Sequence, residues 1–164
     1  MDVQNTGRRS VARCAMLSAV TAFATMIAAN AALAGQCPAD KRGVDVTKPS
    51  TVAAKDVTDK VLASIDLAKE KVALADHQLR IRQLEVKPGG IVPWHSHGDR
   101  PALIYIVRGE IYEYASNCAV PILHKAGEVA AETSVTAHWW QNTSTETVVL
   151  ISADVLHDQT DHNM

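Results

Sequence analysis

The chain has 164 residues, a formal net charge of −2 at pH 7, and 47% hydrophobic residues. This length is enough for one compact domain and hardly for two. The sequence has neither a basic stripe nor interleaved basic and aromatic residues, so it gives no support to nucleic-acid binding.

The first 34 residues differ in composition from the rest. Three arginines precede an uncharged, almost wholly apolar stretch at 14–34, which ends in Ala32-Leu33-Ala34. This layout predicts a signal peptide at 1–34 and export to the periplasm or the medium, with no membrane association after cleavage. The mature chain would keep 13 basic and 17 acidic residues, a net charge of −4. A membrane anchor is the alternative, because 14–34 is nearly long enough to span a bilayer.

Two of the three cysteines lie beyond the predicted cleavage site, Cys37 and Cys118. In an oxidising compartment such a pair favours a disulfide, which would tie the start of the mature chain to the region near 116–120. Two free or buried thiols are the alternative, because spacing alone does not give the geometry that a disulfide requires.

The remaining residues divide into three segments. We predict an extended arm at 35–58, where periodicity is weak, a barrel domain at 59–158 and a tail at 159–164. Period-two alternation predicts strands at 60–68 and 77–86, followed by a Lys-Pro-Gly-Gly turn at 87–90, while a stretch near 66–76 could instead be helical. Further strands are predicted at 102–107, 108–114, 120–124, 128–133, 136–141 and 147–155. Many short strands separated by frequent turns indicate an all-β sandwich or barrel.

Two spaced motifs make the chain resemble the cupins, a family of small jelly-roll barrels. The first cupin motif has a glycine, five residues, His-x-His, a glutamate and a closing glycine. Its matches here are Gly89, His95, His97 and Gly109. The glycine, histidine and asparagine of the second motif are matched by Gly127, His138 and Asn142, although Thr133 and Val135 replace its proline and second glycine. The resemblance covers about residues 60–156 and implies a cupin jelly-roll (double-stranded β-helix) barrel.

Three histidines are the candidate metal ligands. Alternate residues on a strand share a face, so His95 and His97 point the same way, and His138 would join them from another strand. Three neutral imidazoles on rigid strands suit a divalent transition metal: Fe, Zn, Mn, Ni or Cu. Asn142 shares the parity of His138 and is expected to orient the site or the following turn.

The chain departs from the cupin pattern at Ala102, where the family has a glutamate that is usually the fourth ligand. Three interpretations follow. The metal is held by three histidines alone, as in the three-histidine cupins that include thiol dioxygenases. A second oxygen ligand, Asp99 or Glu110, replaces the glutamate. Or metal binding is lost, and the barrel is a ligand pocket or a scaffold.

Other residues near the motifs have competing interpretations. Trp140 shares the parity of His138, so it either lines the pocket or only packs. Arg100 could pair with a substrate anion, or it could lie at the surface in a salt bridge. Tyr105 and Tyr112 are expected to pack in the barrel. The other histidines, His124 among them, are expected at the surface or in the core.

Two functional classes remain open. The first is a metal-dependent enzyme, either a dioxygenase-like oxidoreductase acting on a small molecule or an isomerase or lyase. The second is a non-catalytic periplasmic module that binds a small molecule or a metal, because cupins host unrelated chemistries. The sequence shows no acid–base pair beside the histidines that would decide between them. A homodimer is also expected, with the N-terminal arm near the partner, because an open jelly roll leaves strand edges to protect.

Overall fold

The computed structural model describes residue 1 and residues 35–157, so the predicted signal peptide beyond Met1 and the predicted tail lie outside the described residues. The strands are β1 (Lys55–Asp66), β2 (Gln78–Ser96), β3 (Ala102–Arg108), β4 (Glu110–Ala115), β5 (Ile122–Lys125), β6 (Val129–Glu132), β7 (Ala137–Gln141) and β8 (Val148–Leu156). Two 3-10 turns accompany them, η1 (Ala39–Lys41) and η2 (Leu67–Lys69). The helical interpretation of 66–76 is thus reduced to one short turn. Within the described part of the chain, no helix has the length and apolar character needed to cross a bilayer.

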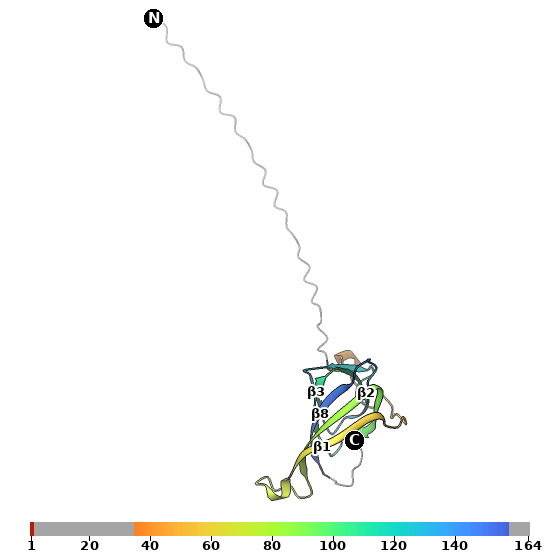
Figure 1. Ribbon diagram of the computed structural model, residues 1–164. Coiled ribbons are helices and arrows are strands. Elements are labelled where there is room, and N and C mark those ends of the chain that lie inside the picture. The colour runs from red at the N-terminus through yellow and green to blue at the C-terminus, as the bar shows by residue number, and fades with distance from the viewer. Residues whose placement is uncertain (2–34, 158–164) are drawn as a thin grey trace. The chain divides into compact units, whose positions relative to one another are not determined.

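All eight strands belong to one antiparallel sheet (Figure 1). Its order is β5-β4-β7-β2-β8-β3-β6, and β1 pairs with β2 outside this path. The sheet curls into a nearly closed barrel, which confirms the all-β fold predicted from the strand spacing and the jelly-roll barrel implied by the cupin resemblance. Side chains alternate in direction along each strand. On β3 the inward residues Ala102, Ile104 and Ile106 are buried, whereas Leu103, Tyr105 and Val107 are exposed. The expectation that Tyr105 packs in the barrel is therefore wrong.

The interior of the barrel is apolar at one end and polar at the other. The apolar cluster contains Leu84, Val86, Val92, Ile104, Ile106, Ile111, Ala130, Trp140, Val148 and Leu150. Buried polar residues continue the same inward faces, among them Glu113 on β4, Glu132 on β6 and Asp154 on β8. The apolar end holds the barrel together, and the polar end is where chemistry can occur.

The predicted turn at 87–90 is instead part of one long strand, β2. Up to Val86 this strand pairs with β8, and from Ile91 it pairs with β7. Gly89 has a φ of +74°, in the left-handed region that favours glycine, and it lies where the strand changes partner. The Pro-Gly-Gly sequence therefore bends a strand without ending it, and the strand continues to the His95 and His97 region.

Strand β1 differs from prediction in burial and in where it begins. It starts at Lys55, inside the segment predicted as an arm at 35–58. Period-two alternation is typical of a half-buried strand, but Val61, Leu62 and Ile65 are 47–50% exposed. The reason is that β1 pairs only with β2 and is an edge of the sheet in the described structure.

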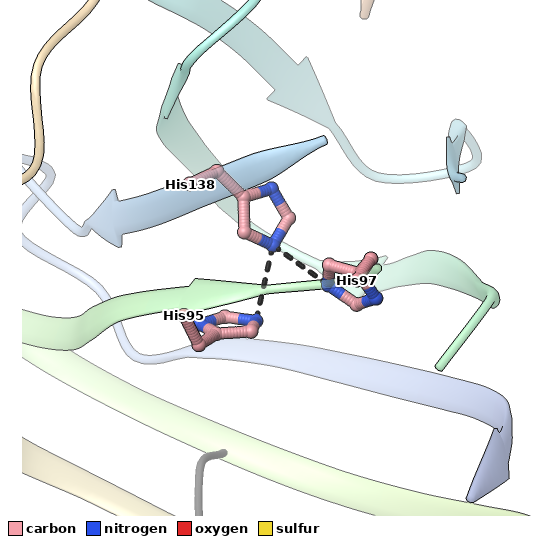
Figure 2. Close-up of side chains that lie close together, drawn as sticks. All are labelled: His95, His97 and His138. Carbon is pink, nitrogen blue, oxygen red and sulfur yellow. Dashed lines mark hydrogen bonds between the residues drawn. The ribbon is translucent and has the colours of Figure 1, made fainter. Parts of the chain in front are cut away.

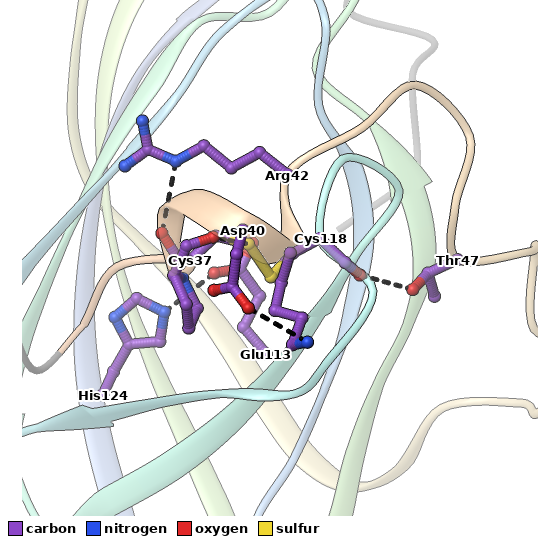
Figure 3. The surroundings of a disulfide bond; sticks show 9 residues. Cys37, Asp40, Arg42, Thr47, Glu113, Cys118 and His124 are labelled. Atoms are coloured by element: carbon purple, nitrogen blue, oxygen red, sulfur yellow. Dashed lines mark hydrogen bonds and ion pairs between the residues drawn. A yellow bond between two sulfur atoms is a disulfide. The ribbon is translucent and has the colours of Figure 1, made fainter. Parts of the chain in front are cut away.

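The N-terminal arm is fastened to the connection between β4 and β5 (Figure 3). Cys37 and Cys118 form a disulfide, with their Cα atoms 5.7 Å apart. Arg42 forms an isolated β-bridge with Cys118, and Thr47 Oγ1 donates to the Cys118 carbonyl oxygen at 2.6 Å. The arm is therefore held against this end of the barrel along residues 37–47.

Candidate metal centre

Strands β2 and β7 place the three histidines at one point. His95 and His138 are directly opposite each other in the antiparallel pair, and His97 lies just beyond Ser96 at the end of β2. All three side chains face the interior, with exposed fractions of 6% for His95, 1% for His97 and 0% for His138. A register shift between Val92 and His95 adjusts the strand before the histidines without changing the parity of His95 and His97.

The three Nε2 atoms converge (Figure 2). His138 Nε2 lies 3.0 Å from His97 Nε2 and 3.1 Å from His95 Nε2. The ring planes are steeply inclined to one another, at 58–87°, with centroids 4.6–5.0 Å apart. Three histidine nitrogens this close form a ready set of ligands for one ion.

The other ring nitrogen of each histidine has its own acceptor. Nδ1 of His95 donates to the Pro93 carbonyl at 2.9 Å, and Nδ1 of His97 donates to the Arg100 carbonyl at 2.8 Å. Nδ1 of His138 donates to Glu113 Oε1 at 2.7 Å. In a neutral imidazole a hydrogen on Nδ1 leaves a lone pair on Nε2. His138 Nε2 lies about 3 Å from the Nε2 atoms of His97 and His95, and one cation bound among the three nitrogens would be coordinated by all three lone pairs, so the donor set fits a metal ion.

Burial keeps two of these histidines in the form that binds metal. It lowers the pKa of His97 to about 4 and the pKa of His95 well below its ordinary value of 6.5. Burial also acts to lower the pKa of His138, but the neighbouring Glu132 and Glu113 outweigh it, and the pKa is raised. His138 is therefore the ligand whose proton a metal has to displace.

The sequence analysis did not predict that two buried glutamates lie next to His138. Glu113 Oε1 and Oε2 accept hydrogen bonds from His138 and from His124 Nε2, at 2.7 and 2.8 Å. Glu132 Oε2 lies 3.6 Å from His138 Nδ1. Burial alone would raise the pKa of Glu113, but the two histidine hydrogen bonds lower it to about 2, whereas burial raises the pKa of Glu132 to about 7. A charged and a protonatable carboxylate therefore do stand beside the histidines, contrary to expectation.

The space in front of His95 and His97 is small. A cavity of about 20 Å³ is lined by both histidines, by Trp140, Arg82 and Ser152, and by Leu84, Val92, Ile104 and Leu150. This volume is close to that of one water molecule. Trp140 is buried, and its indole Nε1 donates to His138 Nε2 at 3.2 Å. Trp140 therefore lines the site as well as packing in the core.

Comparison with known proteins agrees with this geometry. Residues 82–154 match the family model described as the cupin domain. The chain contains a cupin domain. Among solved structures, it is 17% identical to an uncharacterised double-stranded β-helix protein from Klebsiella pneumoniae, covering 72% of this chain and 91% of that one with a TM-score of 0.50.

Two further solved structures are similar at lower scores. The Cnp3 cupin domain of Schizosaccharomyces pombe is 16% identical over 63% of each chain, with a TM-score of 0.48. KdgF from Halomonas sp. is 13% identical over 65% of this chain and 83% of that one, with a TM-score of 0.48. No curated protein matches the chain. The family match and the likeness to the Klebsiella pneumoniae structure support the fold and leave the reaction open.

The cupin glutamate position is occupied by a buried, inward-facing Ala102. Neither proposed replacement reaches the histidines. The Asp99 side chain is 71% exposed and lies 3.8 Å from His157, and Glu110 is exposed on β4. The interpretation in which either residue is the fourth ligand is wrong. Of the three interpretations, the three-histidine set is the one that the described geometry favours.

Arg100 and Asn142 support the cupin site from outside it. Arg100 is 1% exposed, so its interpretation as a surface residue is wrong, and its carbonyl oxygen fixes the His97 ring. Asn142 Nδ2 donates to the Val86 and Glu146 carbonyl oxygens, and its Oδ1 accepts from Ser144. Asn142 therefore orders the turn after β7, as expected, and does not bind at the histidines.

Proposed function

We propose that His95, His97 and His138 together hold one divalent transition metal, and that the protein is an exported oxidoreductase of the dioxygenase type acting on a small molecule. One observation carries this proposal. His138 Nε2 lies 3.0 Å from His97 Nε2 and 3.1 Å from His95 Nε2, while the Nδ1 of each histidine donates to its own acceptor. Export is supported by the signal-peptide layout of residues 1–34 and by the disulfide between Cys37 and Cys118, a bond typical of oxidising compartments.

A redox metal with open coordination positions would supply binding and activation of a small ligand such as dioxygen. The chain contributes orientation and exclusion of water. Glu113 holds the His138 ring and increases its basicity. Leu84, Ile104 and Leu150 form a dry wall around the cavity. The Trp140 indole N–H, directed at His138 Nε2, is placed to donate to a ligand bound beside that nitrogen.

The alternative, a non-catalytic metal-binding module, is favoured by one observation, the cavity of about 20 Å³. An ion and one or two light atoms fill such a space, whereas an organic substrate would require the walls to move. The two functions differ in whether an external ligand reaches the ion.

Ligand access can be tested on the purified protein. Elemental analysis without chelator or added metal identifies the native ion, and the protein is then loaded with Co²⁺ and titrated with azide, a three-atom anion. The enzyme proposal predicts a saturable change in the visible spectrum, and oxygen consumption by the Fe²⁺ form with a reductant or thiol. If azide does not change the spectrum of the Co²⁺ form and the Fe²⁺ form consumes no oxygen, the protein is a metal-binding module.

A further inference from the structure

Gly35, the first residue of the predicted mature chain, lies against the barrel. Its backbone nitrogen donates to the Leu123 carbonyl on β5 at 3.0 Å. A Cβ atom built on Gly35 would lie 3.0 Å from Glu128 Oε2 and 3.2 Å from His124 Nδ1. Since a Cβ atom is about 2.5 Å from the nitrogen of its own residue, the Gly35 nitrogen lies within about 6 Å of both atoms. Three acceptor atoms therefore lie near this end of the mature chain.

His124 contributes an acceptor that nothing else in the described chain uses. The side chain is 1% exposed, and its Nε2 donates to Glu113 Oε2 at 2.8 Å (Figure 3). In the neutral ring the lone pair then lies on Nδ1. This Nδ1 is buried and has no hydrogen-bond partner among the described residues. Buried polar atoms rarely stay unpaired, so a donor is expected here.

The surroundings also favour a positive charge. Gly35 and His124 line a cavity of about 260 Å³ together with Glu113 and Glu132. Glu128 places a further carboxylate beside Gly35, with Oε2 accepting from the Lys125 backbone nitrogen at 2.7 Å. The Arg42 guanidinium also lines the cavity, but its Nε donates to the Cys37 carbonyl oxygen. The missing donor is therefore expected to be a cation.

We propose that Leu123 O, Glu128 and His124 Nδ1 form the binding site for the α-ammonium group that signal-peptide cleavage creates at Gly35. This inference rests on the export part of the proposed function. Hydrolysis of the Ala34–Gly35 bond consumes one water and leaves a carboxylate on Ala34 and an ammonium on Gly35. In the uncleaved chain the Gly35 amide has one hydrogen, which Leu123 O accepts. The ammonium has three, and the two added hydrogens are donated to Glu128 and His124.

The site connects maturation to the metal centre. His124 is hydrogen-bonded to Glu113, and Glu113 is hydrogen-bonded to His138. A new charge at Gly35 therefore lies two hydrogen-bonded side chains from a metal ligand. The disulfide at Cys37, two residues further along, keeps the new terminus in place. Cleavage would thus add contacts that hold the arm against the barrel and fix His124, which is linked through Glu113 to His138.

The experiment compares two purified proteins, residues 35–164 with a native Gly35 terminus and residues 31–164 with Ala34 still attached. Each is made as wild type and as Glu128→Gln. The proposal predicts that the native terminus raises Tm by about 3 °C or more, and that Glu128→Gln removes at least half of this difference. Glu85→Gln, an exposed glutamate on β2, should leave the difference unchanged. Equal Tm values, or a difference that Glu128→Gln does not alter, would overturn the proposal.

A second readout does not depend on stability. The Gly35 amine should be acylated by acetic anhydride at least about tenfold more slowly than the exposed lysines, and Glu128→Gln should speed its acylation. An amine as reactive as the lysines would also overturn the proposal. Metal content of the same samples reports the metal centre separately. N-terminal sequencing of protein from the native host tests cleavage itself, so a failure of export and a failure of the ammonium site are distinguishable.

Discussion

His138 has different surroundings on its two ring nitrogens. Nε2 faces His95 and His97, and Nδ1 faces Glu113 and Glu132. The two glutamates share one buried space but differ in charge, because Glu113 receives two histidine hydrogen bonds that Glu132 lacks. At the scale of single residues, the ionisation of Glu132 is therefore the variable that affects stability near neutral pH.

Glu132→Gln should stabilise the metal-free protein at high pH. Burial raises the pKa of Glu132 to about 7 from its ordinary 4.5, so the folded protein keeps a proton that the unfolded chain loses. For this group, stability is full below about pH 4.5 and falls as pH rises to about 7. Glutamine cannot ionise, so the variant should lose less stability than wild type between pH 5 and pH 8. Urea unfolding at the two pH values measures this, with the exposed Glu110→Gln as control. Parallel losses in wild type and Glu132→Gln would contradict the assignment.

At the scale of elements, alternation and spacing were enough to predict most strands and the parity of His95 and His97. The local sequence at Gly89 predicts a turn, because neighbouring residues do not show that one strand changes its pairing partner there. The role of Glu113 could not be predicted, since it depends on the register that brings β4 beside β7. Alternation along the strand predicts that Glu113 and Ile111 face the same side, but nothing in the sequence indicates which side chain Glu113 would contact.

Among the connections between elements, the disulfide is expected to contribute most to the free energy of unfolding. It joins residues 81 positions apart and fastens the arm to the barrel. Cys37→Ser/Cys118→Ser should lower the free energy of unfolding by about 2–4 kcal/mol, because the unfolded chain regains the entropy of a long loop. Denaturant unfolding measures the loss. Reductant should destabilise wild type and leave the double variant unchanged; equal sensitivity of the two proteins would contradict a bridging role.

At the scale of the whole molecule, β1 presents a free edge of 12 residues in the described structure. Its unpaired backbone groups and exposed Val61, Leu62 and Ile65 are features that soluble proteins usually cover. A second copy of the same strand can pair with it in antiparallel fashion, which gives a two-fold symmetric contact.

We therefore propose that the protein is a homodimer joined along β1. Light scattering at high micromolar concentration should give twice the chain mass. Val61→Lys/Ile65→Lys should shift the protein to monomer, because like charges would face each other across the two-fold axis. Val135→Lys, at another exposed apolar position, serves as the control. A monomeric wild type, or a double variant that stays dimeric, would rule out this interface.

Cobalt titration tests most directly whether His95, His97 and His138 hold one ion. Wild-type protein should bind one Co²⁺ per chain, with a visible spectrum of nitrogen-ligated cobalt. His95→Ala, His97→Ala and His138→Ala should each weaken binding by at least about tenfold, while His77→Ala, which precedes β2 and is not part of the three-histidine group, should not. Circular dichroism checks that each variant is folded. Wild-type protein that takes up neither cobalt nor Fe, Ni, Cu, Mn or Zn, or single variants that bind as tightly as wild type, would contradict the three-histidine metal centre.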